Sequence, residues 1–493
     1  MKSLWAKLHF VGDILHLPDL PKWMCGLLTL MLLLRIPSFF EPYYYGDEMI
    51  YLTLGTGVRQ GIPLYSGLHD NKPPLLYLTA ALSENLFWFK AILAFWSFIT
   101  IIFFWKLSRI ILKNNSKGRV VATVFFALLT TLPLLEGNIA NAELFMIGPS
   151  ILAFLILLGE KLNPKKLFWA GILFGIAALY KIPAAFDLPV IIVFWLVTDF
   201  ASWKKIIKRA LILAAGFATP IFLTFLWYFL SGSLSEYIKA AFLQNVGYLG
   251  SLKPPVDIPI FIRAFAVFTG IALVFYFRKK LSDKFILLCV WSLFALFAIT
   301  LSQRPYPHYL IQVVAPATFL LSMFFTNKNF EQSLTVIPLT VVFFVPFVYK
   351  FWFYPVSSYY LNFMNFATQK VDREVYFRTF SGTTNRNYQI ANFLASSSRP
   401  EDKVFMWDPD SPTVYALSRK LPPIKYSVPY HVYDYSDKAT VVGELSKNPP
   451  KFIILTSGNP LPEITPLLSA KYIPIQQIDG AAIYSRINLV QAK

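Results

Sequence analysis

Long apolar runs dominate the chain, and short segments that carry most of the charges separate them. A run of about 18 or more residues with few charges is typical of a helix that crosses a lipid bilayer. The pattern therefore predicts a polytopic α-helical membrane protein. Eleven spans are expected, at residues 22–40, 89–111, 119–135, 142–159, 166–181, 184–199, 208–230, 259–277, 285–301, 308–325 and 333–353.

The weakest of these ranges are 166–181 and 184–199, because Lys181, Pro183 and Asp187 interrupt the apolar run. If this region formed one broken span, the C-terminal part of the chain would change sides. Two opposite charges near adjacent helix ends also favour a buried ion pair between Lys181 and Asp187.

The lysines and arginines predict the orientation of these spans. With the N-terminus inside, the inner segments hold about twenty of them and the outer loops about six. Cytoplasmic loops carry such an excess of basic residues. We therefore expect a cytoplasmic N-terminus in a bacterial-type cell membrane, and an odd number of spans then places the C-terminal part outside the cytoplasm.

Residues 355–493 differ from residues 1–354, because they contain a larger share of charged residues and their apolar runs are shorter. Strands are expected at Val404–Trp407, Phe452–Thr456 and Tyr472–Ile478, and helices at Asn385–Ser397 and Lys438–Ser446. This alternation predicts a small α/β domain. The chain thus divides into a transmembrane domain at 1–354 and an extracytoplasmic domain at 355–493.

The composition agrees with a membrane protein, because 56% of the residues are hydrophobic and only 15% are charged. A formal net charge of +18 on a soluble protein would suggest a nucleic-acid partner. Here the basic residues are accounted for by orientation, so no nucleic-acid partner is expected. Cys25 and Cys289 lie in apolar runs and indicate neither a disulfide framework nor a metal site.

The first outer loop, residues 41–88, is long, and its segments Asp47–Gln60 and Leu75–Phe87 are expected to form short helices at the membrane interface. Charges at a membrane edge are costly and are therefore functional candidates. On the predicted outer side these are Asp47, Glu48, His69, Asp70, Lys72, Glu136, Glu143, Arg304 and His308. This mixture of carboxylates and cations suits a site that handles a phosphate and an acceptor hydroxyl.

The loop carries an ordered set of motifs within about thirty residues. They are Asp47-Glu48 followed by Tyr51, then Gly61 followed by Tyr65, then Lys72-Pro73-Pro74. This set resembles the lipid-linked-sugar glycosyltransferases of the GT-C fold, and in particular the bacterial branch with protein O-mannosyltransferases and aminoarabinose transferases. Further similar segments are Asn141 to Leu144, Gly171 to Lys181, Arg304 to Tyr309, and Phe405 to Arg419.

The resemblance implies transfer of a sugar from a polyprenyl-phosphate donor to a lipid, glycan or protein acceptor on the outer face of the membrane, with inversion. It implies Asp47 as the base that takes the acceptor proton. Lys72 and Arg304 would stabilise the leaving phosphate. The other residues implied for the site are Glu48 and Glu143 as catalytic, Tyr309 at the donor phosphate, and Tyr51, Tyr65 and His308 at the substrate. A divalent metal ion held by His69 and Asp70 is a further hypothesis, although Asn71 stands where some relatives have an acidic residue.

Simpler interpretations exist for several of these residues. Asp47 and Glu48 also suit the first turn of a helix, where the dipole favours acidic side chains. Lys72 also suits an interfacial lysine whose ammonium reaches water. For the whole chain, the alternatives to an enzyme are a transporter or flippase of a lipid-linked envelope intermediate and a non-catalytic scaffold. The two halves show no repeat of the kind that many transporters have.

Overall fold

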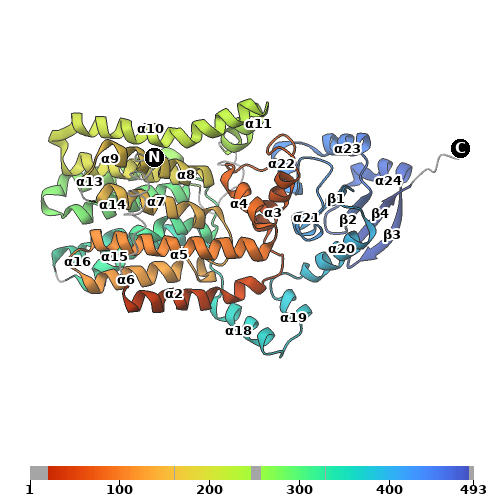
Figure 1. Ribbon diagram of the computed structural model, residues 1–493, viewed down its shortest axis with the longest axis horizontal. Helices are drawn as coiled ribbons and strands as arrows, with labels where there is room; N and C mark the ends of the chain where they lie inside the picture. Colours follow the sequence, from red (N-terminus) through yellow and green to blue (C-terminus); the bar gives the residue numbers. More distant parts are fainter. Residues whose placement is uncertain (1–19, 160, 246–256, 328, 488–493) are drawn as a thin grey trace, which may run out of the picture.

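The computed structural model describes residues 20–159, 161–245, 257–327 and 329–487. Most helices run side by side along the long axis of the molecule, and a smaller domain with a β-sheet caps one end of this bundle (Figure 1). The basic residues at 1–19, at 253 and at 328, which entered the orientation argument, lie outside the described residues.

A helix occupies each of the eleven predicted ranges. The bundle consists of α2 (Lys22–Arg35) with η1 (Ile36–Phe40), α5 (Leu86–Ile111), α6 (Ser116–Leu129) with η2 (Pro133–Leu135), α7 (Ala142–Leu158), α8 (Pro164–Tyr180), η3 (Ile182–Phe186) with α9 (Asp187–Thr198), η4 (Phe200–Ser202) with α10 (Trp203–Leu230), α11 (Leu234–Ile238) with η5 (Lys239–Leu243), α13 (Ile260–Phe277) with η6 (Arg278–Lys280), α14 (Asp283–Thr300), η7 (Pro307–Leu310) with α15 (Ile311–Thr326), and α16 (Phe330–Leu334) with α17 (Val336–Val348).

In the described part of the chain, seven helical segments are long and apolar enough to cross a membrane, and Ala142–Leu158 and Ile182–Thr198 are shorter apolar helices. The chain is therefore a multi-pass membrane protein, while the count of eleven spans stays a prediction. The interrupted region at 166–199 forms two separate helices, α8 and α9. The predicted Lys181–Asp187 pair is wrong, because Lys181 pairs with Glu143, whereas the carboxylate of Asp187 accepts a hydrogen bond from Gln312 Nε2 at 3.5 Å.

Helices α8 and α10 pack closely because glycines face each other at their crossing. A Cβ atom added to Gly171 would lie 2.1 Å from the carbonyl oxygen of Leu213, and one added to Gly216 would lie 2.1 Å from that of Phe168. Small residues allow helix backbones to approach in this way inside a membrane. The crossing fixes α8, and Lys181 follows directly at the C-terminal end of that helix.

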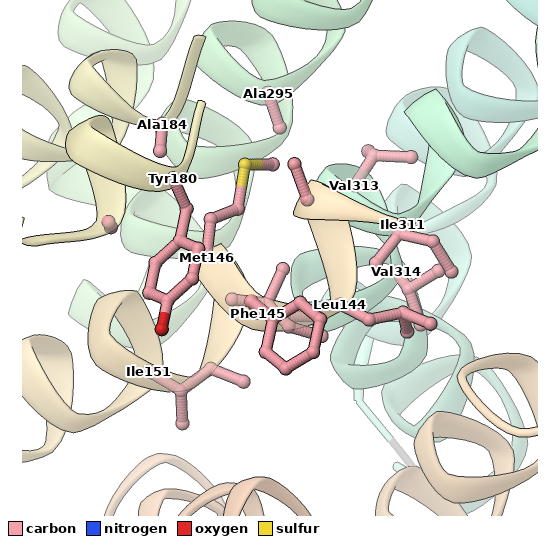
Figure 2. Packing of buried hydrophobic residues seen from close by; sticks show 14 of the residues in the cluster. Leu144, Phe145, Met146, Ile151, Tyr180, Ala184, Ala295, Ile311, Val313 and Val314 are labelled. Carbon is pink, nitrogen blue, oxygen red and sulfur yellow. The ribbon is translucent and has the colours of Figure 1, made fainter. Parts of the chain in front are cut away.

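Helix α7 lies in the centre of the bundle, where almost all of its side chains are buried. Figure 2 shows Leu144, Phe145 and Met146 of α7 among buried residues of the neighbouring helices. The ring of Phe145 stacks on that of Tyr180 in α8, with 5.5 Å between centroids and 14° between planes. This packing holds the first turn of α7, which carries Glu143, in one position.

The first outer loop contains the two predicted helices, α3 (Gly46–Arg59) and α4 (Leu75–Ser83). Residues 48–57 of α3 are buried, because α3 lies between α4 and a helix of the C-terminal domain. Gly55 makes the α3–α4 contact possible, since a Cβ atom there would be 2.7 Å from the backbone nitrogen of Ala81. Helix α3 is thus enclosed by protein on most sides.

The C-terminal domain is an α/β unit, as predicted. It contains α18 (Val356–Ala367), α19 (Arg373–Arg378), α20 (Thr384–Ser397), β1 (Val404–Trp407), α21 (Ser411–Ser418), α22 (Pro429–Tyr435), α23 (Lys438–Lys447), β2 (Phe452–Thr456), η8 (Pro462–Ile464), α24 (Thr465–Lys471), β3 (Tyr472–Ile478) and β4 (Ala481–Arg486).

The sheet has the order β1-β2-β4-β3, in which β1 and β2 are parallel and β4 is antiparallel to both of its neighbours. Phe405 and Trp407 of β1 belong to one buried cluster, and Val404 and Met406 belong to another. The alternation shows that helices cover both faces of the sheet. The three predicted strands are present, and β4 is a fourth.

Several hydrogen bonds join the C-terminal domain to the first outer loop. Thr53 Oγ1 in α3 donates to the carbonyl oxygen of Pro412 at 3.2 Å, and the backbone N–H of Tyr43 donates to Tyr388 Oη at 3.2 Å. The domain is therefore packed against the end of the bundle where α3 and α4 lie (Figure 1). The boundary predicted at residue 354 falls between α17 and α18.

Candidate active site

A cavity of about 720 Å³ lies where the first outer loop, the ends of several bundle helices and the C-terminal domain meet. Its charged and histidine side chains come from segments far apart in the sequence. They are Asp47, Asp70, Lys72, Glu143, Lys181, Arg304, His308, His431 and Asp434. Tyrosines and one tryptophan fill much of the remaining wall, at Tyr45, Tyr51, Tyr306, Tyr309, Trp352, Tyr354, Tyr430 and Tyr435.

Asp47 stands in the first turn of α3, and its carboxylate faces the cavity. Tyr51, one turn later in the same helix, donates a hydrogen bond from its hydroxyl to Asp47 Oδ2 at 3.0 Å. Lys72 Nζ lies 3.8 Å from the same oxygen. The carboxylate is thus held in place by a neutral donor and a nearby cation, and 31% of its side chain is exposed to the cavity.

The backbone of Lys72 is fixed by two tyrosines. Its N–H donates to Tyr77 Oη at 3.1 Å, and its carbonyl oxygen accepts from the hydroxyl of Tyr65 at 2.9 Å. Its ammonium also lies 3.8 Å from Asp70 Oδ2 and 5.1 Å from the ring centroid of Tyr51. These contacts direct the ammonium towards Asp47 and the cavity.

Asp70 is fully buried beside this lysine. Burial alone would raise the pKa of Asp70, but the nearby Lys72 and His431 and the N–H of Asn71 together hold that pKa below its ordinary value. The Asn71 N–H donates to Asp70 Oδ1 at 2.7 Å. Asp70 therefore stays ionised and serves as a fixed negative charge behind Lys72.

Glu143 forms the second acidic position of the cavity. It opens α7, and Lys181, directly after α8, donates a hydrogen bond to its carboxylate. Lys181 Nζ also lies 3.6 Å from the ring centroid of Tyr309. His308 in η7 places Nε2 3.7 Å from Glu143 Oε1. Three helix ends therefore meet around one carboxylate.

The other nitrogen of His308, Nδ1, contacts Glu136, which was among the outer-side candidates but was given no role in the site. Glu136 Oε2 also accepts hydrogen bonds from the hydroxyl of Tyr45 at 2.6 Å and from Asn141 Nδ2 at 3.0 Å. Glu136 adopts a left-handed backbone conformation with φ of 58°. The contact joins residues 172 positions apart in the chain, so no local sequence pattern identifies it.

The C-terminal domain contributes helix α22 to the cavity wall, through Tyr430, His431, Asp434 and Tyr435. Tyr430 and Asp434 are exposed at positions four apart, and so they share a face of the helix. None of these residues was predicted for the site. Their only signal in the sequence is the density of aromatic, histidine and aspartate residues between 430 and 435.

Three residues expected at the site do not line this cavity. Tyr65 is buried and acts through the backbone of Lys72, and His69 is buried against Tyr426 and Tyr435. Glu48 accepts hydrogen bonds from the N–H of Ala140 at 2.6 Å and from Lys90, whose ammonium is 2.7 Å from Glu48 Oε1. The structure therefore places Glu48 in a buried network behind α3.

The pKa of Glu48 reflects that network. Burial raises it, Lys90 opposes the rise, and the neighbouring carboxylate of Glu41 adds to it, with the result that the pKa is about 7. Glu41 Oε2 lies 2.8 Å from Lys90 Nζ, so two carboxylates share one ammonium.

No group of three or more histidine, cysteine, aspartate or glutamate side chains is arranged to hold a metal ion within the ranges that the structure describes. His69 and Asp70, the predicted ligands, are adjacent in sequence, but Asp70 faces Lys72 while the ring of His69 packs on tyrosines.

The helical bundle, the cavity at one end and the α/β domain that covers it together define a GT-C membrane fold. The solved structure of ArnT from Cupriavidus metallidurans bound to undecaprenyl phosphate is similar, with a TM-score of 0.59 and 14% sequence identity over 95% of this chain and 98% of that chain. The apo state of the same protein gives a TM-score of 0.58 and 15% identity over 94% of this chain and 98% of that chain.

A weaker likeness is to the apo oligosaccharyltransferase of Archaeoglobus fulgidus, with a TM-score of 0.45 and 12% identity over 88% of this chain and 69% of that chain. No protein-family model matches the sequence, and no curated protein matches it. The likeness to the two ArnT structures confirms the predicted fold.

Proposed function

We propose that this protein is an inverting glycosyltransferase that moves a sugar from a polyprenyl-phosphate donor to an acceptor hydroxyl or amine at the outer face of the cytoplasmic membrane. The observation that carries the proposal is the single cavity that holds Asp47, Lys72, Glu143 and Arg304 together. The likeness to ArnT, which was solved with undecaprenyl phosphate bound, supports a lipid-phosphate carrier.

The proposed reaction is one displacement at the anomeric carbon. The acceptor oxygen or nitrogen forms a bond to that carbon, the bond from the carbon to the phosphate oxygen breaks, and the phosphate leaves with the electron pair. Because there is one displacement, the anomeric configuration inverts. The acceptor proton passes to the carboxylate of Asp47, which is exposed to the cavity and fixed by Tyr51.

The leaving phosphate gains negative charge as its bond to the sugar breaks. Lys72 and Arg304 line the cavity with Asp47 and would stabilise this charge. Tyr309 and Lys181, which contact each other in the same wall, extend the positive side of the cavity. Glu143 holds Lys181 and has His308 beside it, and these contacts would keep this wall in place.

The position of the cavity suits substrates of different solubility. It lies at the end of the membrane helices, beneath the C-terminal domain, so that an isoprenoid chain can remain among the helices while the acceptor enters from water. The aromatic side chains of the wall offer flat apolar faces beside polar hydroxyls, an arrangement suited to sugar rings. The chemical nature of the glycosylated product would show whether the acceptor is a lipid, a glycan or a protein.

The deciding experiment uses the full chain in lipid nanodiscs. Mass spectrometry of the lipid that copurifies identifies the donor sugar, and the same method then follows sugar transfer into an envelope extract. The proposal requires a sugar-bearing polyprenyl phosphate and its conversion to free polyprenyl phosphate with a glycosylated product. Movement of the intact donor across the bilayer of sealed vesicles that contain the protein, without transfer, would instead support a flippase and end the enzyme proposal.

A further inference from the structure

Helix α22 of the C-terminal domain and the segment just before it contact the end of the loop that carries Lys72. We call residues 69–72 the Lys72 loop. The N–H of His69 donates to the carbonyl oxygen of Lys425 at 2.8 Å, and Asn71 Nδ2 donates to Tyr435 Oη at 3.0 Å. His431 Nε2 lies 3.5 Å from Asp70 Oδ1. Three of the four loop residues therefore contact residues 425–435.

These contacts are buried and specific. His69 pairs with Tyr426 as a short parallel β-bridge, and its ring lies 4.9 Å from that of Tyr435. His431 is buried, and desolvation lowers its pKa despite the raising effect of Asp70. Asp70 therefore contacts the imidazole of His431 on one side and the cation Lys72 on the other.

From this geometry we infer that the C-terminal domain, through Tyr435 and His431 of α22, positions Lys72 for the donor phosphate. The inference rests on the function proposed above, and it adds a donor-side role for the C-terminal domain. A lysine side chain is long and flexible, so its placement depends on the backbone from which it starts. Tyr65 and Tyr77 fix that backbone locally, and Tyr435 fixes the preceding residue from the other domain.

The same helix also faces the cavity, because Tyr430 and Asp434 line it. Helix α22 thus contacts the Lys72 loop with one part of its surface and presents exposed side chains to the substrate space with another. A displacement of the C-terminal domain would move Lys72 with it. Tyr435 and His431 are positioning residues in this scheme, since they act through Asn71 and Asp70.

The test measures binding of undecaprenyl phosphate to the full chain in nanodiscs, by native mass spectrometry or tryptophan fluorescence. The variants are Tyr435→Phe, Asn71→Ala and their combination. Each single change removes the same hydrogen bond, so each should weaken binding by about three- to tenfold, which is the range for one hydrogen bond. The double variant should bind undecaprenyl phosphate about as well as the single variant that binds it less tightly. The reason is that both changes remove the same hydrogen bond, which can be lost only once.

Tyr433→Phe is the matched control, because this exposed tyrosine lies in the same helix and contacts Trp407 rather than the loop. It should bind undecaprenyl phosphate as the wild type does. The inference would be overturned if the losses of binding free energy in the two single variants added up in the double variant. It would also be overturned if Tyr435→Phe bound undecaprenyl phosphate as tightly as the wild type.

Lys72→Met separates the inference from the function on which it rests. If Lys72→Met weakens binding and Tyr435→Phe does not, the proposed donor site stands and the positioning role fails. If Lys72→Met binds normally, the proposed phosphate site fails and the inference fails with it. Thermal unfolding of each variant shows whether a loss of binding reflects loss of the folded state.

Discussion

The ammonium of Lys72 lies 3.8 Å from the carboxylate of Asp47, within the wall of one cavity. The separation is longer than a direct hydrogen bond, and both side chains are partly exposed. The ammonium of Lys72 and the carboxylate of Asp47 therefore partly neutralise each other without forming a direct hydrogen bond. A donor phosphate can take the ammonium while Asp47 keeps its bond from Tyr51, so the two groups have separate tasks at one reacting centre.

The first prediction concerns Asp47. In Asp47→Asn the side chain keeps its shape and can still accept a hydrogen bond from Tyr51, but it no longer takes a proton at neutral pH. Sugar transfer should fall by about a hundredfold or more, the range for loss of a general base. The measurement is the rate at which free polyprenyl phosphate forms from the donor, together with the affinity for undecaprenyl phosphate, which should change little.

Glu463→Gln provides a control for this carboxylate, because Glu463 is exposed in the C-terminal domain and pairs only loosely with Lys438 at 3.5 Å. It should leave transfer at the wild-type rate. Equal losses in Asp47→Asn and Glu463→Gln would indicate a general effect of charge, and an active Asp47→Asn variant would remove Asp47 as the base.

The second prediction concerns the cations. Lys72→Met and Arg304→Met each remove one charge from the side of the cavity assigned to the leaving phosphate. A hydrogen bond to a charged group is stronger than a neutral one, so each change should lower the rate of transfer by about ten- to a hundredfold. Lys451→Met, which changes a lysine paired with Asp402 in the C-terminal domain, should not.

Rates measured over a range of donor concentrations separate the two roles. A charge that acts only on the leaving group lowers kcat, whereas one that also holds the ground-state phosphate raises KM. Wild-type rates in both variants would contradict the assignment of this wall to the phosphate.

The third prediction concerns Glu143 and Lys181, which form an ion pair where α7 begins and α8 has just ended. Glu143→Gln leaves the ammonium of Lys181 without its carboxylate partner, and Lys181→Met leaves the carboxylate of Glu143 without its ammonium partner. Each change should lower the melting temperature, because a lone buried charge is costly. The double variant should be more stable than the two losses added together would predict. Simple addition of the two losses would show that the pair contributes little.

The sequence allowed prediction of those parts of the molecule that depend on local pattern. The apolar runs matched helices in all eleven ranges, because backbone hydrogen bonds must be satisfied within each helix inside a bilayer. The first outer loop was also identified, since its motifs lie within about thirty residues. Asp47, Tyr51 and Lys72 are close in sequence and meet in space.

Other parts depended on contacts that no local pattern encodes. Glu48 follows Asp47 directly, yet successive residues of a helix point about 100° apart, so Asp47 faces the cavity while Glu48 faces Lys90. The contact from His308 to Glu136 and the docking of α22 on the Lys72 loop join distant segments. A sequence predicts that such charges need partners but does not identify the partners.

The last prediction concerns the pH dependence of stability through Glu48. Its pKa in the folded protein, about 7, lies above the ordinary value of 4.5. The folded state therefore binds the proton more tightly than the unfolded state, and stability falls as the pH rises from about 4.5 to about 7. The groups around it are Lys90, the carboxylate of Glu41 and the N–H of Ala140. In Glu48→Gln this titration is absent, so the melting temperature should fall less than that of the wild type between about pH 5 and pH 8.

Thermal unfolding at both pH values measures the difference, and Glu463→Gln, which leaves the network unchanged, should follow the wild type. An unchanged pH dependence in Glu48→Gln would contradict this prediction and would mean that Glu48 stays ionised beside Lys90.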